Sequence, residues 1–177
     1  MTTTDQTRFG DVEQTDAGAW RLRFTRVLPH PLEKVWQAIT EAGHLEHWFP
    51  TTIEGERRAG APLRFSFAED RFPAFEGEML AYEPQSMMEF RWGPDVVRIE
   101  LRSVPGGTEL TLLDTLEERG KAARDSAGWH TCLDALEASL EGDAKAREQL
   151  SRPDWGELHA RYAQSFGPEA ATIGPPE

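Results

Sequence analysis

The most regular pattern of apolar positions along the chain lies between Gly120 and Gly142. Apolar and small residues recur there at spacings of three and four, which places them on one face of a helix with 3.6 residues per turn. We therefore predict one long helix over this stretch, with its apolar face packed against another layer of the protein. The residues on this face are Ala122, Ser126, Trp129, Leu133, Leu136 and Leu140.

Upstream of this helix, apolar and polar residues alternate with period two, which is typical of strands buried on one face. Residues 9–14 and 20–28 predict a hairpin, because a turn signal at Asp16–Gly18 separates them. The same alternation dominates the chain after Pro50, and its short, glycine- and proline-rich links favour antiparallel pairing of neighbours. The clearest alternating sets are Leu63, Phe65 and Phe67, then Met88, Phe90 and Trp92, then Val97, Ile99 and Leu101.

Two short helices are expected between the hairpin and the later strands. Pro31 suits the first turn of a helix over Leu32–Thr40, Gly43 breaks it, and a second helix follows over His44–Phe49. The predicted order is strands, two short helices, more strands and one long helix. Runs of like elements favour an α+β fold with an antiparallel sheet over a doubly wound parallel sheet.

A further helix is expected in the C-terminal extension, over Trp155–Phe166, where four apolar residues form a narrow seam. We expect this seam to dock on the outside of its own domain, and docking onto a second subunit is the alternative. The chain is accordingly divided into a loose N-terminus at residues 1–8, one folded domain at 9–142, and a helical extension and tail at 143–177.

Composition narrows the classes of partner. The chain has 177 residues, a formal net charge of −12 and a pI near 4.9, so nucleic acid and anionic membrane surfaces would mostly repel it. Cys132 is the single cysteine, which excludes an internal disulfide, and we interpret it as a small buried residue.

The location is expected to be cytoplasmic. The first residues are polar and acidic, without the apolar core of a signal peptide, and no run of about 18 apolar residues is present to insert into a membrane.

Three segments together resemble the AHSA-like branch of the START, or SRPBCC, superfamily, named after an activator of a heat-shock chaperone ATPase. They are PLEKVWQAITEAGHLEHWFP, FEGEMLAYEPQSMMEFRWG and GWHTCLDALEASLEG, and they occur in this order within Trp20–Gly142. The resemblance implies a helix-grip fold, in which a curved antiparallel β-sheet wraps around the long C-terminal helix. Two short helices would close one end, and a cavity would lie between sheet and helix.

A shared fold does not transmit a chemistry, so several functions stay open. We expect a small domain that binds a hydrophobic small molecule in the cavity, as a carrier, sensor or sequestering protein. The first alternative is an enzyme of polyketide-cyclase or hydrolase type, and the second is a co-chaperone or interaction module with a chaperone or a second copy as partner. The chain has no nucleophile elbow, phosphate loop, dinucleotide fingerprint or HExxH motif, which favours binding over catalysis and predicts no cofactor.

The expected ligand-binding residues come from the aromatic and methionine positions of the strands and from the long helix. His130 and Glu137 lie about 40–60° from the centre of the apolar face, so both could reach the cavity edge, with His130 as a candidate acid or base. The alternatives are that these two pair with the sheet or face solvent, and that the aromatic residues simply fill the core. The full expected set is Trp48, Phe49, Phe65, Phe67, Met79, Met88, Phe90, Trp92, Trp129, His130, Leu133, Leu136 and Glu137.

His44 and His47 are candidate metal ligands, because they stand three residues apart with Glu41 one turn earlier. The same residues form the polar side of a short helix that carries Leu45 and Trp48 on its other side. We interpret them as a solvated surface and expect no metal site there.

Overall fold

A computed structural model describes residues 8–174 of the chain. The expected loose N-terminus therefore lies outside the described residues except for Arg8, which is tied into ion pairs with Asp134 and Glu137 at 2.5 Å each. No helix within the described range is long and apolar enough to cross a membrane.

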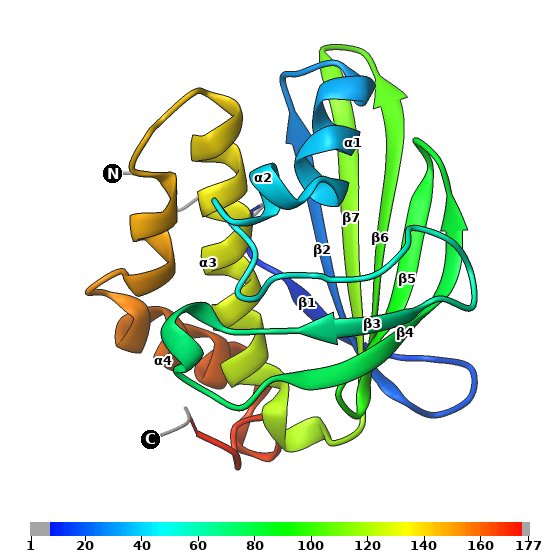
Figure 1. The fold of residues 1–177 in the computed structure, drawn as a ribbon. Coiled ribbons are helices and arrows are strands. Elements are labelled where there is room, and N and C mark those ends of the chain that lie inside the picture. Colours follow the sequence, from blue (N-terminus) through cyan, green and yellow to red (C-terminus); the bar gives the residue numbers. More distant parts are fainter. Residues whose placement is uncertain (1–7, 175–177) are drawn as a thin grey trace.

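One seven-stranded antiparallel sheet forms the framework of these residues, as Figure 1 shows. The hairpin of β1 and β2 joins the last strand of a meander that runs from β3 to β7, which gives the order β1-β2-β7-β6-β5-β4-β3. A register shift between Met79 and Ala81 interrupts the pairing of β4 with β5, and such irregularities bend a sheet. The strands are β1 (Asp11–Gln14), β2 (Trp20–Leu28), β3 (Pro62–Phe65), β4 (Phe75–Glu83), β5 (Met87–Trp92), β6 (Asp95–Val104) and β7 (Gly107–Leu116).

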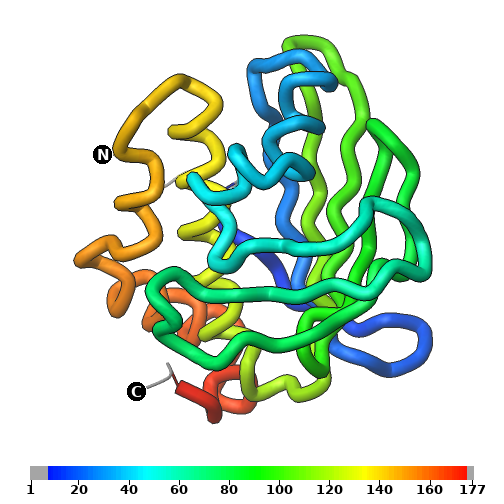
Figure 2. Tube along the Cα trace, viewed as in Figure 1, coloured from blue at the N-terminus to red at the C-terminus, as the bar shows by residue number. Residues whose placement is uncertain are grey.

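The long helix α3 (Ala122–Leu140) lies between the sheet and the C-terminal segments (Figures 1 and 2). Every residue of its predicted apolar face is buried. Its four large members, Trp129, Leu133, Leu136 and Leu140, contribute on the order of 1.5–3 kcal/mol each on burial. The curved sheet around this helix, with short helices at one end, confirms the α+β helix-grip fold.

The two short helices are α1 (Leu32–Thr40), which matches its prediction, and α2 (Ala42–Leu45), which is earlier and shorter than predicted. Gly43 lies inside α2 and does not end α1, which stops at Thr40 with Glu41 as its C-cap. Trp48 and Phe49 follow α2 in a turn, where the backbone N–H of each donates to the carbonyl of Leu45 at 3.1 and 2.8 Å.

The helical extension packs on the outer side of α3. Its helix α4 (Trp155–Phe166) has the predicted bounds, and Leu158 and Tyr162 of the seam are buried against the domain. Upstream of α4, the extension contains a 3₁₀ segment, Ala146–Ser151. Three further 3₁₀ turns lie at Ala68–Asp70, Arg119–Lys121 and Pro168–Ala170.

Candidate ligand-binding site

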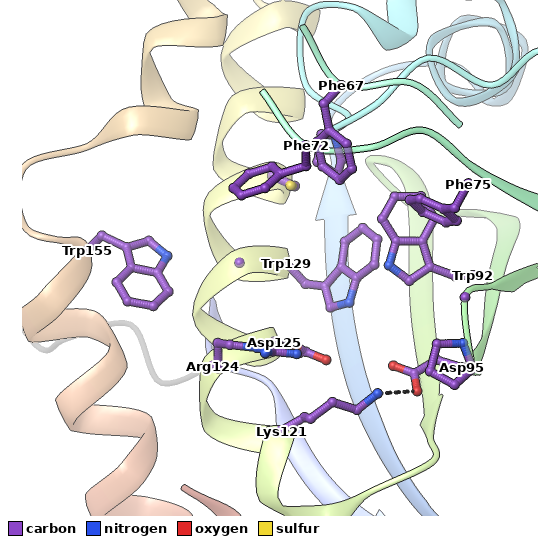
Figure 3. A pocket seen from close by; sticks show the side chains of 15 residues that line it. Phe67, Phe72, Phe75, Trp92, Asp95, Lys121, Arg124, Asp125, Trp129 and Trp155 are labelled. Atoms are coloured by element: carbon purple, nitrogen blue, oxygen red, sulfur yellow. Dashed lines mark hydrogen bonds and ion pairs between the residues drawn. The ribbon is translucent and has the colours of Figure 1, made fainter. Parts of the chain in front are cut away.

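A cavity of about 550 Å³ lies beside the first half of α3. The turn between β5 and β6, the loop before β4 and the start of α4 form its other walls. Six of its lining residues are aromatic, and Figure 3 shows Trp129 of α3 opposite Trp92 and Phe75, with Trp155 on the far side of α3. The aromatic lining comprises Phe67, Phe72, Phe75, Trp92, Trp129 and Trp155.

The rings of this lining are held by edge-to-face and tilted contacts with one another. The centroid of Trp92 lies 4.9 Å from that of Phe75 and 5.9 Å from that of Trp129. Phe65 and Phe49, both fully buried, support Trp92 at 4.9 and 5.3 Å. Such contacts fix the orientation of each ring, so the aromatic walls are preformed.

One end of the cavity is charged. Lys121, at the N-terminal end of α3, donates from Nζ to Oδ1 of Asp95 at 2.8 Å, and the same oxygen accepts the backbone N–H of Glu117 at 3.0 Å. One turn along α3, Nε of Arg124 donates to Oδ1 of Asp125 at 2.8 Å. Figure 3 shows Asp95, Lys121 and Asp125 gathered at this end.

A third carboxylate, Asp114 of β7, stands behind these two. Its Oδ2 accepts the indole N–H of Trp129 at 2.9 Å, and its buried Oδ1 has no hydrogen-bond partner among the described residues. Burial, followed by the nearby charge of Asp95, raises the pKa of Asp114 well above its ordinary value. Burial also raises the pKa of Asp125.

The acidic end is the one group of potential metal ligands found among residues 8–174, since one oxygen from each of Asp95, Asp114 and Asp125 lies within 4.8 Å of the others. Carboxylate oxygens suit hard cations such as Mg²⁺ and Ca²⁺. Lys121 already places a positive charge on Asp95, however, so a metal ion would have to displace its ammonium group.

Three of the expected ligand-binding residues, Phe67, Trp92 and Trp129, line this cavity. Phe67 does so from a loop, since β3 ends at Phe65 and Phe67 makes only an isolated bridge to Thr51. Eight others lie in the packed core with at most 2 % exposure. They are Trp48, Phe49, Phe65, Met79, Met88, Phe90, Leu133 and Leu136.

The remaining two, His130 and Glu137, are not among the residues that line the cavity. His130 is buried under α4, where its Nδ1 lies 2.8 Å from the hydroxyl of Tyr162. Glu137 pairs with Arg8 at 2.5 Å and with Arg26 at 3.4 Å. The apolar face of α3 is wider than the sheet alone requires, because the extension covers a second side of the helix.

Ionic contacts join the extension to the domain around Asp134. This carboxylate pairs with Arg26 at 3.0 Å and with Arg152 at 2.8 Å, and its Oδ2 lies 3.6 Å from Nε2 of His130. Burial and the neighbouring guanidinium groups together lower the pKa of His130 to about 4, against the opposing charge of Asp134. His130 is therefore neutral at physiological pH and acts as an uncharged hydrogen-bonding residue.

The histidines near α2 lie apart from the aromatic cavity. His44 is exposed and lies 3.5 Å from Glu41, and His47 is half-buried. His47 borders a second hollow of about 680 Å³ between α2 and the segment from Pro50 to Ala68. Its walls share Phe67 with the first cavity but contain no tryptophan and none of the three clustered carboxylates, so we take the aromatic cavity as the candidate site.

Sequence reasoning missed the charged end of the cavity, although one signal for it was present. Along β7 the inward positions read Thr108, Leu110, Leu112, Asp114 and Leu116, so Asp114 occupies an inward position in a row of leucines. A carboxylate in such a position must find a compensating partner. Asp95 and Asp125 come from two other elements, and spacing along the chain carries no trace of their proximity.

The sequence profile of the activator of Hsp90 ATPase homolog 1-like proteins matches residues 29–141. This match covers more than half of the chain and includes the three segments on which the resemblance rests, except for Gly142 at the end of the third. The chain belongs to this family. A comparison of the AHSA1-like chain with curated protein sequences finds no significant match.

Solved structures with the same fold include EF2215 from Enterococcus faecalis, a conserved protein of unknown function, with a TM-score of 0.73 and 17% identity over 89% of this chain and 90% of that one. CalU16 from Micromonospora echinospora has a TM-score of 0.67 and 20% identity, over 89% and 92% of the two chains. DynU16, a protein in the dynemicin biosynthetic locus, has a TM-score of 0.65 and 27% identity, over 72% of this AHSA1-like chain and 49% of its own length.

Proposed function

We propose that this protein is a small ligand-binding domain that holds a hydrophobic small molecule in the aromatic cavity, as a carrier, sensor or sequestering protein. The observation that carries the proposal is the set of fixed aromatic rings around a space of about 550 Å³. Small-molecule sites typically measure about 300–1,000 Å³ and combine apolar walls with a few polar groups. The acidic end supplies those polar groups.

The likeness to DynU16 supports a role with small molecules, since that protein belongs to a biosynthetic locus. An interaction module receives less support, because Val27 is the only large apolar side chain exposed among residues 8–174. The single cysteine is buried and fits a reducing compartment, and we propose the cytoplasm as the site of action.

Catalysis in the same cavity is the second candidate, and the raised pKa of Asp114 is the observation that favours it. A raised pKa lets a carboxyl group keep its proton to higher pH than usual, and such a group can serve as a general acid. In an enzyme of cyclase or hydrolase type this acidic end would take the role that the sequence suggested for His130.

The cavity offers a direct test, because Gly128 lines it and has no heavy atom within 4 Å of the position of its absent Cβ. The substitution Gly128→Leu would fill the cavity without removing a contact, and it also replaces a helical glycine by a better helix former. Gly156→Leu in α4 is the matched control, since Gly156 is exposed, lies in a helix and has equally open surroundings.

The assay is titration with N-phenyl-1-naphthylamine, an uncharged dye that fluoresces in apolar sites, together with native mass spectrometry of the freshly purified protein. We expect the dye to bind the natural sequence and Gly156→Leu with equal affinity, and Gly128→Leu at least about tenfold more weakly. No dye binding by the natural sequence, together with no co-purifying molecule, would overturn the proposed function.

A further inference from the structure

The charges at the acidic end of the cavity do not balance. Asp95 and Asp125 each have a cationic partner at 2.8 Å, Lys121 and Arg124 respectively. Asp114 is the third carboxylate of the cluster and has no cationic partner in the part of the chain that the structure describes. Ionisation of all three carboxylates beside two cations would leave one negative charge at the inner end of an aromatic cavity.

The unmatched carboxylate is also incompletely hydrogen-bonded. Asp114 is 1% exposed, and its Oδ1 finds no donor among residues 8–174. An uncompensated buried carboxylate costs several kcal/mol, so a group that persists in such a place either keeps a proton or receives a cation. The described residues supply no such cation, and the two carboxylates beside Asp114 in the cluster, Asp95 and Asp125, line the cavity from which a ligand would approach.

The geometry of the three carboxylates suits an ammonium group. One oxygen from each lies within 4.8 Å of the others. Acceptors about 2.8 Å from a tetrahedral nitrogen are about 4.6 Å apart, so a single R–NH₃⁺ group can donate to all three. Trp92 and Trp129 line the same cavity, and indole faces attract cations.

We propose that the acidic end formed by Asp95, Asp114 and Asp125 recognises a primary ammonium group, so that the ligand is a hydrophobic, aromatic-compatible molecule with one basic amine. This assignment rests on the proposed function and names the ligand class within it. The apolar part of the ligand would lie between the aromatic walls, and its amine would complete the charge balance beside Lys121. A metal ion is the competing occupant, and it would have to displace the Lys121 ammonium from Asp95.

The raised pKa values of these carboxyl groups predict that ammonium binding depends on pH. Burial raises the pKa of both Asp114 and Asp125, so without a ligand these groups retain protons at higher pH than usual. The charged groups that face this end are Asp95, Asp114, Asp125, Lys121 and Arg124. Binding of an ammonium favours the ionised carboxylates, so its affinity should rise with pH while that of a neutral ligand should not.

Two matched probes test the assignment by displacement of bound N-phenyl-1-naphthylamine. The probes are 2-naphthylmethylamine and 2-naphthylmethanol, which share the apolar part and differ in charge. We expect the amine to bind at least about tenfold more tightly near neutral pH, and the difference to grow between about pH 5 and about pH 8.

The variants Asp114→Asn and Asp125→Asn should bring the affinities for the amine and the alcohol to within about twofold of each other. Asp16→Asn is the control, because it removes the same charge from an exposed turn. Circular dichroism and thermal unfolding confirm that each variant is folded, and the two aspartate positions provide independent tests of the same site.

Equal affinity for both probes would overturn the assignment and leave the proposed function standing. Binding of the dye without displacement by either probe would overturn it as well. Calorimetric titration with MgCl₂, CaCl₂ or ZnCl₂ alone that shows binding abolished by Asp125→Asn would replace the ammonium by a metal ion. Failure of the dye itself to bind would instead overturn the proposed function, and this assignment with it.

Discussion

His130 makes the stability of this protein depend on pH in a way that can be calculated. The side chain lies under α4, with Nδ1 at 2.8 Å from the Tyr162 hydroxyl and three arginines, Arg8, Arg26 and Arg152, in its surroundings. Burial and, to a smaller extent, the arginines lower its pKa from 6.5 to about 4, against the opposing charge of Asp134. The folded protein therefore resists protonation of this ring, whereas the unfolded chain accepts a proton near the ordinary pKa.

The direction and the size of this pH dependence follow from the difference between the folded and unfolded pKa values of His130. Because the folded pKa is lower than the unfolded one, the contribution of His130 to stability is complete above about pH 6.5 and is lost as the pH falls toward about 4. A shift from 6.5 to about 4 corresponds to a loss of about 2 kcal/mol between pH 7.5 and pH 5. The groups around the ring that oppose or assist this change are Asp134 and the three arginines.

The substitution His130→Asn isolates this contribution. Asparagine does not titrate, and it can place a polar atom near the Nδ1 position. All other ionisable groups are present in both proteins, so a difference in the pH dependence of their stability comes from His130. We expect urea unfolding, followed by tryptophan fluorescence at pH 7.5 and pH 5, to show that the natural sequence loses about 2 kcal/mol more than the variant.

His44→Asn is the control, because His44 is exposed and should leave the pH dependence unchanged. An equal loss of stability in the natural sequence and in His130→Asn would show that the ring titrates normally, and would refute the reasoning.

Two further predictions concern the extension and the cysteine. Tyr162→Phe removes a hydroxyl that accepts the backbone N–H of Gly10 at 2.9 Å and lies 2.8 Å from Nδ1 of His130, so we expect a loss of about 1–3 kcal/mol and a melting temperature lower by several degrees. Tyr82→Phe makes the same change at a half-buried ring, and a similar loss there would contradict this explanation. Burial raises the pKa of the Cys132 thiol to about 12, so Ellman's reagent should label it only after denaturation, and rapid labelling of the native protein would show that the thiol is accessible.

The repeating patterns of the chain were sufficient to predict most of its elements. Period-two alternation located β2, β3, β5 and β6, and the spacing of three and four located α3 and the seam of α4 with its bounds at Trp155 and Phe166. These predictions held because the periodicity of an element shows which of its side chains must be buried, whatever the element packs against. The second short helix is present, but its predicted bounds were wrong, since a helix of four residues has too few positions to show a period.

The sequence likewise predicted only part of the candidate site. The sequence by itself determined that α3 has an apolar face, that aromatic residues gather on the strands, and that Phe67, Trp92 and Trp129 are candidates for a lining. The tertiary structure decided which side of α3 meets the cavity and which side meets the extension, and so placed His130 and Glu137 away from the aromatic lining.

Only the tertiary structure brought Asp95, Asp114 and Asp125 together with Lys121. The physical reason is that periodicity reports which face of an element is buried, whereas the identity of the partner face depends on how separate elements pack. The contacts around these carboxylates join β6, β7 and the start of α3, and local sequence carries no record of such contacts.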